Sequence, residues 1–177
     1  MTATEHVILV DKDDKETGIA EKIEAHKQNL CHRAFSIFIF RKQPELELLL
    51  QKRADNKYHS AGLWTNTCCS HPRPGESILQ SGKRRLQEEM GISAHLISLG
   101  WFHYIAPFEN GLTENEVDHV LVGTLEQEEF IPNPNEVKDY KWISLPDLTK
   151  EIMQHPQDFT PWLSLALVKI QENIAVI

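Results

Sequence analysis

The chain has 177 residues, of which 41% are hydrophobic and 25% are charged, and its formal net charge is -8 at pH 7. This length and composition are typical of one globular domain with a substantial core. The negative charge argues against general binding of nucleic acid, and no apolar run reaches the length of about 18 residues that a membrane-spanning helix needs.

The N-terminus lacks a basic region followed by an apolar stretch, so we expect no signal peptide and a cytoplasmic protein. The chain has three cysteines, which argues against a disulfide framework. We expect a small-molecule substrate, no membrane partner, and a monomer or weak homodimer.

The first part of the chain alternates short apolar segments with polar turns. Residues 6–10 predict a strand, and residues 16–20 predict a second strand that returns as a hairpin. A short helix is predicted over residues 21–27. Residues 33–40 predict the clearest strand, with both faces buried, because both alternating sets of side chains are largely apolar. Residues 45–51 are predicted to pair back as the next strand.

The middle of the chain is predicted to hold a strand followed by a long helix. Residues 64–71 predict the strand, in which Cys69 and His71 share one face because alternate side chains point to the same side. The helix is predicted over residues 76–90, and it ends at Gly91, a residue type favoured just after the last helical turn.

The last part of the chain returns to strands and then ends in helices. Strands are predicted over residues 95–106, 116–125 and 140–143, and helices over residues 146–154 and 161–173. Strands and helices therefore mix without strict alternation. This order favours an α+β fold, with a mixed sheet sandwiched between helices.

Histidines and carboxylates recur in a pattern that suits a metal. His26 and His32 precede the clearest strand, His71 lies on the cysteine strand, and Glu114 and Glu116 share one face if their segment is extended. Such a set suits a divalent transition ion in roughly octahedral geometry. Structural zinc favours paired-cysteine spacing, which adjacent cysteines do not provide. Taken singly, each histidine is more often a surface or hydrogen-bonded residue, and spacing alone does not join the five into one site.

Charged side chains predict a second, anion-binding half. Glu88 and Glu89 near the end of the long helix could hold Mg2+, which favours one or two carboxylates together with phosphate oxygens. The candidate cations for a phosphate group are Lys22, Arg53, Lys57 and Arg85. The alternative is that all of these are ordinary surface charges in helical salt bridges.

Taken together, these residues resemble a known family. The run Trp64–Pro72 (WTNTCCSHP), with Glu114-Asn115-Glu116 downstream and His26 and His32 upstream, resembles type 1 isopentenyl-diphosphate isomerase, a branch of the Nudix superfamily. The resemblance covers nearly the whole chain, and it implies one Nudix-like domain over residues 1–177, with a core at about 30–165. The N-terminal segment 1–29 would then supply a metal ligand and a diphosphate contact.

The Nudix helix motif is present in altered form. The residues that match it are Glu76, Arg84, Leu86, Glu88, Glu89, Gly91 and Ile92. Ser70 stands where the motif begins with Gly, and Arg85 stands where the hydrolases carry a Glu. The hydrolases use that carboxylate cluster to hold metals that activate water. Replacing one carboxylate with Arg85 removes a metal ligand and adds a positive charge, which suits binding a diphosphate without cleaving it.

The resemblance also implies a role for each residue. Cys69 matches the catalytic cysteine, Glu116 the catalytic glutamate, Tyr104 an active-site tyrosine, and Trp162 an aromatic side chain over the hydrocarbon. The implied metal ligands are His26, His32, His71, Glu114 and Glu116. Glu89 would help to hold a Mg2+ on the substrate diphosphate. The implied diphosphate-binding cations are Lys22, Arg53, Lys57 and Arg85.

The implied reaction is the reversible 1,3-allylic rearrangement of isopentenyl diphosphate to dimethylallyl diphosphate, by protonation and deprotonation through a tertiary carbocation. Its implied cofactors are one divalent metal (Mn2+, Mg2+ or Zn2+) in the His/Glu site and a second Mg2+ bound with the diphosphate. Two alternatives remain. A Nudix pyrophosphohydrolase would need the full carboxylate run that Arg85 breaks. A non-catalytic metal-binding module would leave the four cations without a purpose.

Overall fold

The computed structural model describes residues 5–42, 44–127 and 129–177, so the first four residues of the predicted N-terminal segment lie outside the described residues. The strands are β1 (His6–Val10), β2 (Glu16–Glu21), β3 (His32–Lys42), β4 (Leu46–Arg53), β5 (Trp64–Thr65), β6 (Cys68–Ser70), β7 (Ile97–Pro107), β8 (Thr113–Thr124) and β9 (Val137–Ser144). The helices are α1 (Lys22–Lys27), α2 (Ile78–Met90), α3 (Leu145–Gln154) and α4 (Pro161–Glu172), with short 3-10 turns η1 (Pro156–Asp158) and η2 (Ile174–Val176).

Strand β3 is the centre of one mixed sheet. It pairs antiparallel with β1, β4 and β6, and parallel with β8. β8 continues to β7, β4 continues to β5 and β9, and β1 pairs with β2. Because β3 contacts four other strands along its length, residues far apart in the sequence meet at its edges.

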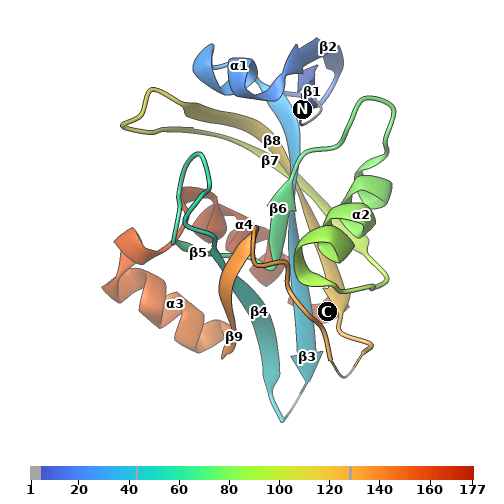
Figure 1. The fold of residues 1–177 in the computed structure, drawn as a ribbon. Coiled ribbons are helices and arrows are strands. Elements are labelled where there is room, and N and C mark those ends of the chain that lie inside the picture. The colour runs from blue at the N-terminus through green and yellow to red at the C-terminus, as the bar shows by residue number, and fades with distance from the viewer. Residues whose placement is uncertain (1–4, 43, 128) are drawn as a thin grey trace.

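Helices cover both faces of this sheet, so the predicted α+β sandwich is confirmed (Figure 1). Phe35, Ile37 and Ile39 of β3 pack in the core that includes Leu86 of α2. Phe38 and Phe40 of β3 pack in a second core, which includes Leu148 of α3 and several residues of α4. The predicted burial of β3 on both faces is therefore also confirmed.

The N-terminal hairpin is fastened to the central strands by a group of charged side chains. Arg33 of β3 contacts Asp14 at 2.7 Å and Glu16 at 2.8 Å. His119 of β8 contacts Asp14 from the other side, with 2.9 Å between Nε2 and Oδ2. These contacts and the pairing of Leu9 with His32 fix the hairpin at one end of the sheet, where α1 follows it (Figure 1).

One predicted element is wrong. Residues 64–71 do not form a single strand, because β5 pairs with β4 whereas β6 pairs with β3. The two residues between them bind the backbones of both neighbours. The Asn66 amide donates to the carbonyl of Ile37, and the Thr67 hydroxyl donates to the carbonyl of Leu49. The chain therefore crosses from one strand to the next at this point.

Other boundaries shift by a few residues. α2 begins at Ile78, after Ser77 forms a capping box, and it ends as predicted at Gly91, whose φ of 68° suits glycine. β8 begins at Thr113, so it includes Glu114. Among the residues that the structure describes, none of the helices is both long and apolar enough to traverse a lipid bilayer.

Candidate metal centre and adjoining cavities

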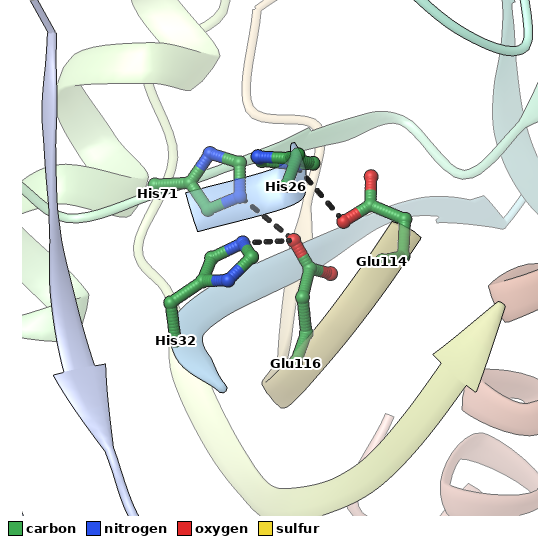
Figure 2. A group of neighbouring side chains, drawn as sticks. All are labelled: His26, His32, His71, Glu114 and Glu116. Atoms are coloured by element: carbon green, nitrogen blue, oxygen red, sulfur yellow. Dashed lines mark hydrogen bonds and ion pairs between the residues drawn. The ribbon is translucent and has the colours of Figure 1, made fainter. Parts of the chain in front are cut away.

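Five side chains converge beside the N-terminal end of β3. They are His26 of α1, His32 at the start of β3, His71 just after β6, and Glu114 and Glu116 of β8 (Figure 2). Each offers one nitrogen or oxygen atom, and these atoms all lie within 4.8 Å of one another. The structure therefore brings together all five residues that the sequence could not join by spacing.

Strand register explains part of this convergence. His32 of β3 lies directly opposite Glu116 of β8, and Glu114 shares the face of Glu116 because the segment is extended. His32 Nε2 and His71 Nε2 lie 3.3 Å and 2.7 Å from Glu116 Oε1. His26 Nε2 lies 3.2 Å from Glu114 Oε2.

Backbone carbonyls fix the orientation of two of the imidazoles. His26 Nδ1 donates to the carbonyl of Lys22 at 2.7 Å, and His32 Nδ1 donates to the carbonyl of Leu30 at 2.8 Å. Each Nε2 lone pair therefore faces the cluster. These two Nε2 atoms and Glu114 Oε2 are buried without a hydrogen-bond partner. Buried nitrogen and oxygen atoms left open in this way fit a divalent metal ion, so the group could bind one.

The protonation states also suit metal binding. Burial would raise the pKa of Glu116, but its contacts with His32 and His71 hold the pKa well below its ordinary value. The pKa of Glu114 is also lowered, by the imidazoles on either side of it and against the effect of burial. Burial lowers the pKa of His71 to about 4. Two charged carboxylates and a neutral imidazole at neutral pH are the forms that bind a metal.

A narrow cavity of about 30 Å³ adjoins the cluster. Its walls include Arg53, His59, Cys69, Tyr104, Glu116 and Trp162. Burial raises the pKa of Cys69 to about 12, although the Arg53 guanidinium 3.6 Å from the sulfur opposes this rise. Cys69 is therefore a thiol at neutral pH. Cys68 points away into the core beneath α2, as the predicted alternation requires.

Two aromatic side chains hold fixed positions in this cavity. The Tyr104 hydroxyl donates to Glu116 Oε2 at 2.6 Å. Trp162 of α4 is buried, and its Nε1 donates to Asn66 Oδ1 at 3.2 Å. Asn66 is itself bonded to the carbonyls of Ile37 and Cys68. The crossing segment between β5 and β6 thus positions both Trp162 and the cysteine pair.

A wider cavity of about 510 Å³ lies next to the narrow one, and both cavities share Ser70 and His71. Its lining is rich in cations, with Lys22, Arg73, Arg84 and Arg85. Of the predicted diphosphate cations, Lys22 and Arg85 line this cavity, whereas Arg53 lines the narrow one. An anion in the wide cavity would lie beside the metal cluster.

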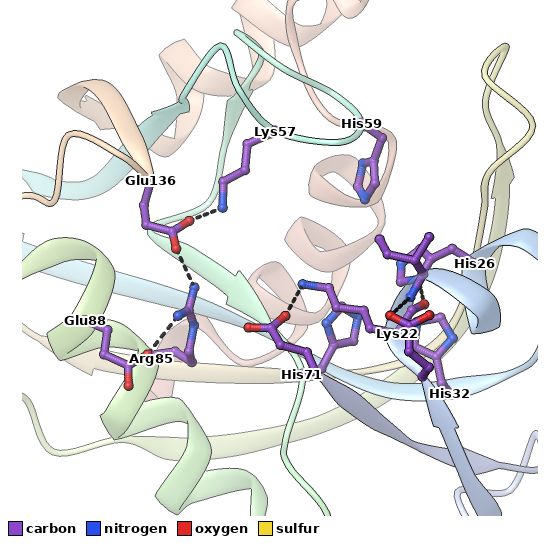
Figure 3. Close-up of polar contacts among 12 residues, drawn as sticks. Lys22, His26, His32, Lys57, His59, His71, Arg85, Glu88 and Glu136 are labelled. Carbon is purple, nitrogen blue, oxygen red and sulfur yellow. Dashed lines mark hydrogen bonds and ion pairs between the residues drawn. The ribbon is translucent and has the colours of Figure 1, made fainter. Parts of the chain in front are cut away.

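Three of the four predicted cations are paired with carboxylates. Lys22 contacts Glu5 at 2.9 Å. Lys57 pairs with Glu136, which also contacts Arg85 at 3.2 Å (Figure 3). Burial would raise the pKa of Glu136, but Lys57 and Arg85 lower it, so Glu136 is charged at neutral pH. An incoming diphosphate would therefore have to compete with these carboxylates.

Glu89 is buried below Arg85, at the end of α2. Its Oε1 accepts from Arg85 at 2.5 Å and its Oε2 accepts from Gln51 at 3.1 Å. Both oxygens therefore already have partners, and a Mg2+ at this position would require Arg85 to move. Its neighbour Glu88 pairs with Arg84 and Arg85 at the surface.

Sequence reasoning missed two residues at the site. His59 lies in the loop between β4 and β5, and its Nε2 is 2.6 Å from Glu114 Oε1. Glu136 precedes β9 and bridges two of the predicted cations. His59 could have been suspected from the sequence because it lies two residues after Lys57, a predicted site residue. No local sequence pattern marks Glu136.

Comparisons with known proteins identify the family of the chain. A family model described as NUDIX domain matches residues 31–163. The chain is 49% identical to the isopentenyl-diphosphate Delta-isomerase of Serratia proteamaculans, covering 96% of this chain and 93% of the relative. It is 45% identical to the protein of the same name from Aliivibrio fischeri strain MJ11, covering 97% of both chains.

The fold is also similar to that of solved structures. DR0079 from Deinococcus radiodurans has a TM-score of 0.73 at 17% identity, covering 94% of this chain and 98% of that one. The NUDIX domain of NrtR from Shewanella oneidensis, solved with ADP ribose, has a TM-score of 0.62 at 16% identity, covering 80% and 86%. At this identity the likeness supports the fold alone.

Proposed function

The chain belongs to the isopentenyl-diphosphate Delta-isomerases within the NUDIX domain family, and we propose that Cys69 and Glu116 are the acid–base pair of the isomerisation. The reaction converts isopentenyl diphosphate reversibly to dimethylallyl diphosphate. An isolated alkene has no acidic C–H bond. A proton is therefore added first to the terminal carbon, which gives a tertiary carbocation, and a different proton is then removed from the carbon on the other side.

The register of three strands is the observation that supports this pair. Cys69 of β6 lies opposite Ser36 of β3, and Glu116 of β8 lies opposite His32 of the same strand. Opposite residues of paired strands point to the same face. Ser36 and His32 also share one face of β3, because they are four residues apart in an extended strand. The two side chains therefore face one cavity from strands on either side of β3, an arrangement that suits a proton donor and a proton acceptor around one alkene.

The protonation states of the pair suit the reaction. The raised pKa of Cys69 keeps a proton on the thiol, and the lowered pKa of Glu116 leaves the carboxylate free to accept one. Tyr104, hydrogen-bonded to Glu116, offers a path for the exchange of that proton with the cavity. Because the reaction is reversible, each member of the pair must both give and take a proton.

The carbocation has to be stabilised and kept from water. The indole of Trp162 is a cation–π partner, worth roughly 0.5–2 kcal/mol, depending on how far the site is desolvated. The narrow cavity of about 30 Å³ has room for little more than one water molecule. A hydrocarbon chain that fills this cavity leaves no room beside the carbocation for water to capture it.

The metal ligands in this proposal are His26, His32, His71, Glu114 and Glu116, with Mn2+, Mg2+ or Zn2+ as the ion. When bound, such an ion supplies positive charge that fixes the position of Glu116 and lowers its affinity for a proton. The orphaned nitrogen and oxygen atoms of the cluster support this assignment.

The diphosphate contacts in this proposal are Lys22, Arg53, Lys57 and Arg85. Glu89 would hold a second Mg2+ on the diphosphate. The cationic cavity of about 510 Å³, which adjoins the narrow one at Ser70 and His71, supports the assignment of Lys22 and Arg85, which line it. Charge contacts with the diphosphate would hold the substrate at a distance from the reacting carbons. The binding energy of these contacts would then orient the alkene between the acid and the base.

The test is incubation with isopentenyl diphosphate and Mg2+ in deuterated water. We expect the native protein to form dimethylallyl diphosphate that carries deuterium, and Cys69→Ala to lose about 10²-fold or more of this activity. Cys68→Ala is the matched control, because Cys68 faces the core and should retain most of the activity. Released phosphate without an isomer would instead indicate a pyrophosphohydrolase. No turnover with metal bound would indicate a non-catalytic module.

A further inference from the structure

We propose that His59 is a positioning residue that holds the metal ligand Glu114 in place and ties the loop of residues 54–63 to the metal centre. This inference rests on the proposed metal centre and extends it by one residue outside the five ligands. His59 is not one of these five, and it contacts Oε1 of Glu114 whereas His26 contacts Oε2.

The Glu114 carboxylate lies between two imidazoles. Its Oε2 is 3.2 Å from His26 Nε2, and its Oε1 is 2.6 Å from His59 Nε2. Both members of the second contact are buried, with side-chain exposures of 2% for His59 and 4% for Glu114. Figure 3 shows the ring of His59 directed from its loop toward the side on which His26 and His32 lie.

The hydrogen-bond partners of His59 suit a donor rather than a metal ligand. His26 and His32 donate through Nδ1 to carbonyls, so their Nε2 atoms carry lone pairs. His59 Nδ1 instead faces the Ser60 hydroxyl at 3.2 Å, and a hydroxyl can donate to it. The Nε2–H of a neutral His59 is then free to donate to the Glu114 carboxylate.

Such a donor has a physical purpose at this position. Glu114 and Glu116 lie on one face of β8, and two neighbouring carboxylates repel each other. His59 Nε2 lies 2.6 Å from Oε1, the outer oxygen of Glu114, and a proton on this nitrogen would stabilise the carboxylate charge while Oε2 stays directed at the cluster. Partners that orient metal ligands in this way affect metal affinity or activity by about 10–100-fold.

The ring of His59 is fixed by packing on two sides. It is stacked on Phe108, with 4.7 Å between ring centroids and 12° between ring planes. It stands nearly perpendicular to Trp162, at 87° and 5.9 Å. The carbonyl of His59 accepts from Arg53 at 3.1 Å, and Arg53 also contacts the sulfur of Cys69. His59 thus contacts the metal ligand Glu114, the indole of Trp162 and the guanidinium of Arg53.

The variant that isolates the contact between His59 and Glu114 is His59→Phe, which keeps a stacking ring and removes the Nε2–H group. We expect the affinity for Mn2+, measured by chelator competition without substrate, to fall about 10–100-fold. His59→Gln, whose side-chain amide can occupy the position of Nε2, should recover part of the loss. Saturating Mn2+ should bring the kcat of His59→Phe most of the way back.

His119→Phe is the matched control. His119 makes the same kind of imidazole–carboxylate contact, with Asp14 at 2.9 Å, but away from the metal centre. His119→Phe should change the free energy of unfolding and leave the affinity for Mn2+ unchanged. Native-like Mn2+ affinity in both His59→Phe and His59→Gln would overturn the inference, and so would a kcat loss that excess Mn2+ does not restore. The Mn2+ measurement uses no substrate, so a failure of the isomerase assignment would be seen separately in the deuterium experiment.

Discussion

The Tyr104 hydroxyl and the Glu116 carboxylate form a hydrogen bond of 2.6 Å between directly opposite residues of β7 and β8. This bond uses Oε2 of the carboxylate, whereas Oε1 faces His32 and His71. The two oxygens of Glu116 therefore serve different neighbours. One belongs to the candidate metal cluster, and the other belongs to the cavity with Cys69.

Removing the Tyr104 hydroxyl tests whether the two oxygens of Glu116 have these separate roles. We expect Tyr104→Phe to lower kcat about 10²-fold, because Oε2 loses its proton partner in the cavity, while Mn2+ affinity stays within a factor of two. Steady-state kinetics and chelator competition measure the two quantities. Tyr140→Phe changes an exposed tyrosine and should alter neither. A fall in Mn2+ affinity with unchanged kcat would place the main effect of Tyr104 on the metal cluster instead.

The reactivity of Cys69 should have an unusual pH dependence. Alkylation by iodoacetamide requires the thiolate, and burial raises the pKa of Cys69 to about 12. The rate at Cys69 should therefore rise about tenfold per pH unit throughout the range in which the fold is stable. An exposed cysteine in a peptide levels off just above its pKa of about 8.5. Mass spectrometry of the modified peptide measures the rate, and a plateau below pH 9 would show that the thiol is not shielded in this way.

The secondary structure could largely be predicted because its signals are local. Two apolar faces marked β3, and Gly91 marked the end of α2. The break within residues 64–71 could not be predicted in the same way. It depends on bonds from Asn66 and Thr67 to the backbones of two different strands, and these are distant in sequence.

The candidate site was only partly accessible from the sequence. His32 meets Glu116 because β3 and β8 are parallel and in a particular register, which residue spacing does not reveal. The resemblance to a known family supplied the ligand set instead. His59 and Glu136 lie in loops without periodicity, and their partners Glu114 and Arg85 are far away in the sequence. Only the tertiary structure connects them.

Removal of the metal should destabilise the protein. A ligand present at about one hundred times its Kd stabilises the folded state by about 2.7 kcal/mol, and each kcal/mol shifts Tm by about 2–4 °C in a chain of this size. Chelation should therefore lower Tm by roughly 5–11 °C, and added Mn2+ should restore it. His26→Ala should show little dependence on metal. An equal response to Mn2+ in that variant would exclude His26 as a ligand.

Glu136 should weaken the binding of diphosphate groups, because its carboxylate occupies both Lys57 and Arg85. Glu136→Gln removes this charge but keeps the side-chain size and the backbone bond from Ala54 to the carbonyl of residue 136. Partly exposed ion pairs are worth about 0.2–1 kcal/mol each, so losing two of them should let inorganic pyrophosphate bind about two- to thirtyfold more tightly. Titration calorimetry with Mg2+ present measures this affinity.

The matched control for Glu136→Gln is Asp55→Asn, which breaks an exposed pair between Asp55, in the loop of residues 54–63, and Lys138 of β9. Both variants remove one negative charge, so a general effect of net charge would tighten pyrophosphate binding in both. A specific effect appears in Glu136→Gln alone, because Glu136 contacts two of the predicted diphosphate cations whereas Asp55 pairs with Lys138. Weaker binding in Glu136→Gln would mean that Glu136 orients Lys57 and Arg85 for the diphosphate, and that this orientation outweighs its competition for their charge.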